Sequence, residues 1–189
     1  MKFLILLTLV FSFSFSKPFL SENYRYYDIY PTNIHKLEDS MNSISPISSD
    51  GEVRHGTVNW KLKYYYKRER KRGVCSITAV KTKVDVVYFV PKLAKNYKAP
   101  KGTKRVFSRY YNILKTYLKK HSDIAVEAAS EIEKALIKIK PTNKDCDLIK
   151  IDAKNIATGI IRKYKKKNKD YEIRTYEGFL DSVREEKLL

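Results

Sequence analysis

The stretch LKKHSDIAVEAASEIEKAL, residues 118–136, decides the fold of this chain. Apolar residues recur in it at intervals of three and four, the spacing of one face of an α-helix. The same period extends from about Thr103 to Ile139, and Pro141 then ends it. The sequence therefore predicts one long amphipathic helix that carries His121 on its apolar side.

A second helix is predicted close behind the first, over roughly residues 147–168, where apolar residues again follow a helical period. Because the connection between the two is short, they are expected to form a helical hairpin. The remaining segment, YEIRTYEGFLDSVREEKLL (171–189), is polar overall and is predicted to lie over the surface of the domain.

Strands are predicted upstream of the long helix. TVNWKLKYYYKRE (57–69) alternates apolar and polar residues, and VCSITAVKTKVDVVYFVP (74–91) reads as a longer strand that Pro91 ends. The turn between them is short and basic, so an antiparallel hairpin is expected. YRYYDIY (24–30) is a further strand, and a short helix follows it within 32–44. The predicted fold class is α+β: a small antiparallel β-sheet packed on a long-helix hairpin.

The N-terminus reads as a secretory signal peptide. Lys2 precedes a compact apolar run, Phe3 to Val10, and small residues stand before a cut expected near Ser16–Lys17. The run is too short for a typical membrane span, although an uncleaved anchor is the alternative. The predicted organisation is a signal peptide, residues 1–16, and one secreted or periplasmic domain, residues 17–189.

The chain has two cysteines, Cys75 and Cys146. In an exported protein, two cysteines predict one disulfide bond, here between the second hairpin strand and the turn that joins the two helices. Two unpaired thiols are the alternative. A redox-active pair is disfavoured because the cysteines do not form a C-x-x-C motif.

The net charge of +18 indicates contact with an anionic polymer or a membrane surface, and export argues against nucleic acid as the partner. YKRERKRG (66–73) and RKYKKKNKD (162–170) are the candidate anion patches. A lysine-rich composition without a binding role is the competing interpretation. His55, in the loop SPISSDGEVRHG (45–56), is predicted to be an ordinary exposed loop histidine.

Several segments, taken in their order and spacing, resemble a bacterial domain family of unknown function whose members are described as predicted secreted zinc-dependent proteases. The resemblance covers about residues 24–178. It is carried by YYDIY, DGEVRHGTVNW, GVCSITAVKTKVDVVYFVP, LKKHSDIAVEAASEIEKAL, CDLI and YEIRTYEG together with the two cysteines.

The resemblance implies an HExxH helix, in which two histidines one turn apart share a zinc ion and the glutamate acts as general base. Of these positions only the first histidine is retained, as His121. The catalytic glutamate is replaced by Ser122 and the second histidine by Ala125. A later family histidine, a plausible third ligand, is replaced by Glu177.

These replacements remove the chemistry that the motif provides. Ala125 offers no lone pair, and the Ser122 hydroxyl is a poor base near neutral pH. His121 and Glu177 would supply only two of the three protein ligands that a catalytic zinc needs. The sequence therefore predicts a pseudoenzyme without a cofactor: a non-catalytic binding protein of the cell envelope, whose partner is an unidentified envelope component or peptide. An active metallopeptidase with a substituted ligand set, and a basic polyanion-binding protein, remain the alternatives.

Overall fold

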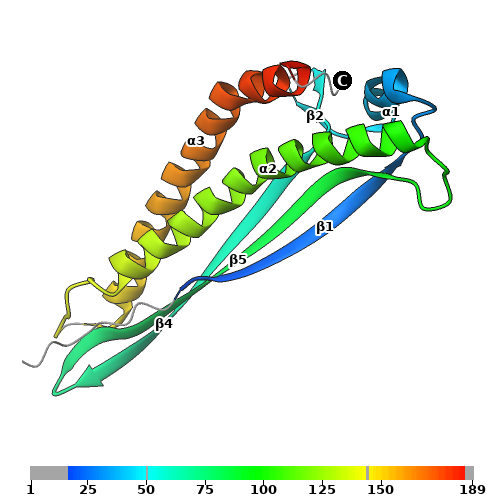
Figure 1. Ribbon diagram of the computed structural model, residues 1–189. Coiled ribbons are helices and arrows are strands. Elements are labelled where there is room, and N and C mark those ends of the chain that lie inside the picture. Colours follow the sequence, from blue (N-terminus) through cyan, green and yellow to red (C-terminus); the bar gives the residue numbers. More distant parts are fainter. Residues whose placement is uncertain (1–16, 50, 144, 186–189) are drawn as a thin grey trace, which may run out of the picture.

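The computed structural model describes residues 17–49, 51–143 and 145–185, so the predicted signal peptide lies outside the described residues. The strands are β1 (Phe19–Ile29), β2 (Ser48–Ser49), β3 (Glu52–Val53), β4 (Thr57–Lys71) and β5 (Val74–Leu93). The helices are the short 3₁₀ turn η1 (Ile34–Lys36), α1 (Leu37–Ile44), α2 (Lys101–Leu136) and α3 (Asp147–Glu185). Figure 1 shows α2 and α3 lying together on one face of the long, twisted sheet formed by β1, β5 and β4.

The predicted hairpin is confirmed. β4 pairs antiparallel with β5 along the whole of β4, from Thr57 opposite Phe89 to Lys71 opposite Val74, and only Arg72 and Gly73 separate the two strands. Both residues have positive φ, 50° and 81°, as a two-residue type I′ turn requires. Glycine takes such a φ without the steric penalty of a side chain.

The α+β class is also confirmed, but the sheet is mixed rather than purely antiparallel. β1 pairs in parallel with β5, with Tyr24 opposite Tyr88, and the strand order is β1-β5-β4. The chain passes from β1 through α1 and then runs back along β4. The tight turn reverses it once more, so β5 takes the direction of β1 and lies between the two edge strands.

β5 continues past Pro91 to Leu93, although the sequence predicted that this proline would end the strand. β4 begins at Thr57, which pairs with Phe89, so β4 does not extend as far as Pro91. At that point β5 has a partner only in β1, where Pro91 lies opposite Tyr27. Proline has no backbone N–H to donate, so it is tolerated where one side of the strand has no neighbouring strand to bond with.

α2 matches its predicted range, whereas α3 runs through the segment predicted to be a polar surface tail. Phe179 and Val183 in that segment are buried and belong to the main core, where the Phe179 ring lies 6.3 Å from that of Tyr110. Figure 1 shows that α3 bends where its colour turns from orange to red. Near the bend, Thr175 donates its hydroxyl to the carbonyl of Tyr171 at 2.7 Å, a bond typical of curved helices.

The disulfide between Cys75 and Cys146 is present and joins the start of β5 to the connection between α2 and α3. Beside it, the Cys75 backbone exchanges hydrogen bonds with that of Thr142, at 2.7 and 2.9 Å. Cys75 is buried in a second core cluster, formed mainly by α2 and α3 at this end of the sheet. Within the described ranges, no helix is apolar enough over sufficient length to cross a membrane.

Candidate functional site

His121 lies on α2 at the contact between the two long helices. It is 5% exposed, and its ring meets those of Tyr117 and Tyr171 edge to face, with centroids 5.4 and 5.0 Å away. Its Nδ1 lies 2.9 Å from Oδ1 of Asn168 on α3. Burial lowers the pKa of His121, and the bond to Asn168 offsets only part of this effect. The ring is therefore neutral at pH 7, with Nδ1–H donating to Asn168.

A small cavity of about 40 Å³ opens beside this histidine. Its walls come from α2, α3, the start of β4 and the segment that leads into it. The lining residues are Arg54, Gly56, Thr57, Val58, Tyr117, Leu118, His121, Asn168, Glu172 and Tyr176. A volume of this size holds a few atoms, such as a water molecule or a small polar group.

The Arg54 side chain brings a positive charge to this cavity. Its guanidinium carbon lies 3.4 Å from the centre of the Tyr176 ring, and one of its terminal nitrogens lies 3.2 Å from a carboxylate oxygen of Glu52. Nε and Nη1 of Arg54 are buried, and neither has a hydrogen-bond partner among the described residues. Arg54 thus brings a positive charge to the lining of the cavity, and this charge disfavours a metal cation there.

The described residues do not fit a catalytic zinc ion. Ser122 and Ala125 are fully buried, and neither lines the cavity. Ala125 packs in the main core, and the Ser122 hydroxyl lies toward Tyr88. The side chain of Glu177 falls outside the described part of the structure. Among the residues described, no three His, Cys, Asp or Glu side chains come together.

Tyr117, one helical turn before His121, lines the cavity, whereas Ala125, one turn after it, does not. Burial and the nearby Glu172 carboxylate raise the Tyr117 pKa, so the hydroxyl stays protonated and is a poor metal ligand. The carboxylate in the cavity wall belongs to Glu172, which the sequence reading placed in the surface tail. Asn168, Glu172 and Tyr176 are four residues apart, so a helical reading of that tail would have aligned them on one face.

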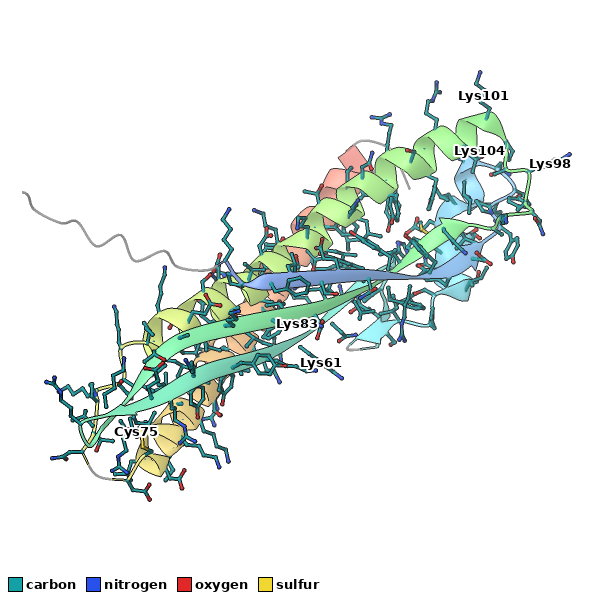
Figure 2. The ribbon with its side chains drawn as sticks, turned by 90° about the horizontal axis from the view of Figure 1, so that it is seen from below. Lys61, Cys75, Lys83, Lys98, Lys101 and Lys104 are labelled. Atoms are coloured by element: carbon teal, nitrogen blue, oxygen red, sulfur yellow. A yellow bond between two sulfur atoms is a disulfide. The ribbon has the colours of Figure 1, made fainter. Side chains whose placement is uncertain are left out.

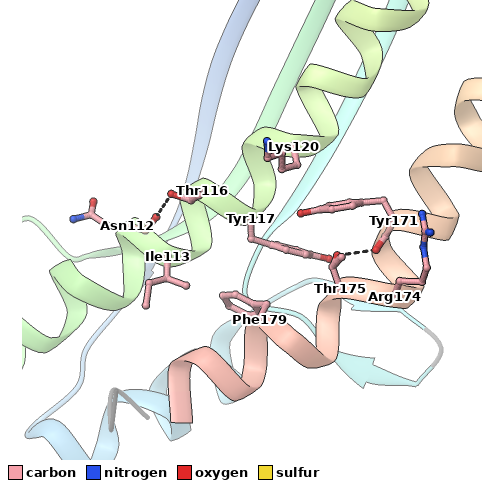
Figure 3. A pocket seen from close by; sticks show the side chains of 9 residues that line it. All are labelled: Asn112, Ile113, Thr116, Tyr117, Lys120, Tyr171, Arg174, Thr175 and Phe179. Atoms are coloured by element: carbon pink, nitrogen blue, oxygen red, sulfur yellow. Dashed lines mark hydrogen bonds between the residues drawn. The ribbon is translucent and has the colours of Figure 1, made fainter. Parts of the chain in front are cut away.

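A larger groove lies on the solvent side of the Tyr117 ring, between α2 and α3 (Figure 3). It has a volume of about 600 Å³ and is mainly apolar. Its lining residues are Asn112, Ile113, Thr116, Tyr117, Lys120, Tyr171, Arg174, Thr175 and Phe179. Figure 3 shows the three rings stacked, with Tyr171 above Tyr117 and Phe179 below. The Tyr117 and Tyr171 centroids lie 5.8 Å apart, and the Tyr117 and Phe179 centroids lie 5.1 Å apart.

Two cations accompany these rings. Lys120 is exposed and has no ion pair with any described residue, and Arg174 donates Nε to the Asp170 carbonyl at 3.1 Å. An apolar groove of this size with a few convergent polar groups is typical of a small-ligand site. Its chemistry suits a flat or apolar group that carries an acid.

The two basic segments singled out in the sequence are partly neutralised by their own neighbours. In the hairpin, Glu69 lies 2.9 Å from Lys67 and 3.3 Å from Lys71, and these lysines lower the pKa of Glu69. On α3, Lys163 pairs with Glu131 at 2.9 Å and Lys167 pairs with Glu127. The lysines of the 162–170 segment thus serve in part to hold α3 against α2.

His55 is buried, which corrects the prediction of an exposed loop histidine. Its Nδ1 lies 2.6 Å from the Tyr110 hydroxyl, and its Nε2 lies 2.7 Å from Oδ1 of Asn42. Burial lowers the pKa of His55 to about 4. The loop is held inward because the Tyr27 hydroxyl donates to the His55 carbonyl at 3.0 Å. At Gly56 a Cβ would come within 2.8 Å of Leu118, so the backbone approaches α2 more closely than another residue would allow.

Comparison with protein families agrees with the resemblance. The family model described as "Bacterial protein of unknown function (DUF922)" matches residues 24–178, which is most of the chain. No curated protein matches the sequence. No solved structure matches it either.

Proposed function

Since this chain belongs to the DUF922 family of bacterial proteins of unknown function, we propose that it is an exported, non-catalytic member that binds a ligand in the groove between α2 and α3. The ligand would be an apolar or aromatic group bearing an acid, presented by an envelope component or a peptide. It would lie on Tyr117, Tyr171 and Phe179, with Lys120 and Arg174 facing its acidic group.

The groove itself is the observation that carries this proposal. It adjoins the one position of the zinc motif implied by the resemblance that keeps a histidine, and Tyr117 lines both the groove and the cavity behind it. Around His121 the chain provides a hydrogen-bonded imidazole, a buried guanidinium and a protonated phenol. This set can recognise a polar group, but it does not offer the three anionic or imidazole ligands of a hydrolytic zinc.

Export is supported by two features. The N-terminal sixteen residues have the pattern of a signal peptide, and the Cys75–Cys146 disulfide is of a kind that persists in oxidising compartments.

The groove should bind 8-anilinonaphthalene-1-sulfonate, an aromatic acid, in a one-to-one complex. Thr116→Trp puts a large side chain into the groove from an exposed position and should weaken binding by at least about tenfold. Lys120→Gln combined with Arg174→Gln leaves the rings in place and should also weaken it, by ~tenfold, because the sulfonate loses its partners. Fluorescence titration of the folded proteins measures both changes.

Thr158→Trp is the matched control, since Thr158 is an exposed threonine on α3 that lines none of the cavities described above. It should bind the probe as the parent chain does. Equal affinity in all four proteins would show that the probe binds elsewhere and would remove the groove from the proposal.

Purified protein should contain far less than one zinc per chain and should not hydrolyse casein or a mixed peptide library when zinc is added. The reason is the set of side chains around His121, where the cavity lining includes the guanidinium of Arg54 and the phenol of Tyr117, neither of which is a good zinc ligand. Elemental analysis and a peptidase assay, both on disulfide-intact protein, check this. Stoichiometric zinc that disappears in His121→Ala would overturn the non-catalytic assignment.

A further inference from the structure

The long sheet has a second face that α2 and α3 do not cover. Figure 2 views the molecule from this side, with the strands in front of the helices. Side chains along β4 alternate between the two faces: Trp60, Leu62 and Tyr64 are half-buried on the helix side, whereas Lys61, Lys63 and Tyr65 are exposed on the other. Figure 2 labels Lys61 and Lys83 on this open face.

Cations collect on this face from all three strands. The members, here called the sheet patch, are Arg25 of β1, Lys61 and Lys63 of β4, and Lys81 and Lys83 of β5. Asp85 is an acidic neighbour on the same face: it lies 2.8 Å from Lys83 and stands opposite Lys61 in the strand register. No described residue forms an ion pair with Lys61, Lys63 or Lys81. The patch therefore keeps a local excess of positive charge.

The strand register places two of these lysines in direct opposition. Lys63 of β4 pairs with Lys83 of β5, and Lys81 lies opposite Tyr65. Like charges that face each other across strands destabilise a sheet. Asp85 offsets part of that cost through its ion pair with Lys83, and a partner that brings negative charge to Lys63 would offset more of it.

The surroundings of the patch favour a membrane surface over a nucleic acid. The cations spread in two dimensions over three strands. This arrangement matches a plane of lipid head groups better than the phosphate backbone of one nucleic-acid strand. Phe19 and Tyr65, 63% and 58% exposed, stand among them. Tyrosine is enriched at membrane interfaces, and an exposed phenylalanine offers apolar surface that can enter the lipid. The Lys83 ammonium lies 5.9 Å from the Phe19 ring.

The two ends of the patch differ in what they offer to a membrane surface. At one end, β1 begins with the exposed Phe19, which lies opposite Lys83. At its other end the patch meets a hollow of about 410 Å³, lined by Arg25, Asn59, Val87 and neighbouring residues. This volume is sufficient for a lipid head group. We propose that the sheet patch docks on an anionic phospholipid surface, with the helices and their groove facing away from the membrane.

The test is co-sedimentation of the full chain with vesicles of phosphatidylcholine alone or mixed with phosphatidylglycerol. The triple variant Lys61→Gln/Lys63→Gln/Lys81→Gln should lose binding to the mixed vesicles by on the order of 100-fold, since each lysine near an anionic surface adds about a factor of five to ten. The N-terminal apolar stretch is identical in every protein compared, so it does not contribute to the difference. Raising the salt concentration should weaken parent binding steeply.

Lys154→Gln/Lys165→Gln/Lys166→Gln is the control, because it removes the same charge from exposed positions on α3. It should bind the mixed vesicles nearly as the parent does. An equal loss in both triple variants would mean that net charge alone drives association. Unchanged binding in the patch variant, or patch-dependent binding of a single-stranded oligonucleotide that outcompetes the vesicles, would overturn the membrane assignment.

Ligand binding in the groove and membrane binding by the sheet patch can be tested independently. Binding of the anilinonaphthalene probe should be the same in the patch variant as in the parent chain, because the two surfaces lie on opposite sides of the sheet. Loss of both activities together in a patch variant with a lowered melting temperature would indicate unfolding, and circular dichroism identifies that case.

Discussion

Replacing Cys75 and Cys146 together by alanine should lower the free energy of unfolding by about 4 kcal/mol. The bond closes a loop with a sequence separation of 71, so it removes much conformational freedom from the unfolded chain. It also holds the helix connection on the start of β5, where Cys75 is 1% exposed within the second core cluster. A domain stability of 5–15 kcal/mol is typical, so this loss is a large share of the total.

Urea unfolding of oxidised protein, followed by far-ultraviolet circular dichroism, measures the change. The parent chain with its disulfide reduced should unfold at nearly the same urea concentration as the double variant, since both lack the cross-link. A shift of less than about 1 kcal/mol would contradict the expectation and would mean that the unfolded chain is already restricted near these residues.

Lowering the pH from 7 to about 4 should remove about 3 kcal/mol of stability through His55 alone. The pKa of this histidine falls from 6.5 in the unfolded chain to about 4 in the folded one, because burial disfavours the charged ring. Above pH 6.5 neither state binds the proton. Between pH 6.5 and about 4 only the unfolded chain does, so the balance moves toward unfolding.

The hydrogen bonds of His55 explain why protonation is resisted. Asn42 Oδ1 accepts from Nε2–H, so Nδ1 accepts the hydrogen of the Tyr110 hydroxyl. A charged ring would carry a hydrogen on both nitrogens, and that hydroxyl, which is fully buried, would lose its acceptor.

His55→Gln should be less stable than the parent chain at pH 7, and it should also lose less stability on acidification, by about 3 kcal/mol. His35→Gln, an exposed replacement in η1, should leave the parent profile unchanged. Unfolding free energies measured at several pH values between 7 and 4 check both statements. Parallel profiles for the parent and His55→Gln would show that another group governs acid unfolding.

The long helix and the hairpin could be predicted from the sequence because each rests on a local pattern. The helical period across 103–139 and the short turn before Val74 need no distant partner to specify them. The C-terminal half of α3 was missed because polar and charged residues dominate its composition. Its buried residues, Phe179 and Val183, nevertheless stand four apart on one face.

The candidate site was only partly accessible from the sequence. His121 could be singled out because it lies on the apolar face of a strongly periodic helix. The groove could not, since its rings come from α2 and from a part of α3 that was read as surface tail. The burial of Arg54 and His55 could not be predicted for a related reason. The loop that carries them is polar, and only its packing against the helices buries it.

The parallel pairing of β1 with β5 has a consequence for biosynthesis. Among the described elements β1 leaves the ribosome first, yet its partner strand arrives only after α1 and the whole of β4 have been made. Such distant pairing is slow because the intervening chain must first be ordered. Until then the tyrosine-rich β1 has no partner strand, and its unpaired backbone groups are open to wrong pairing with other chains.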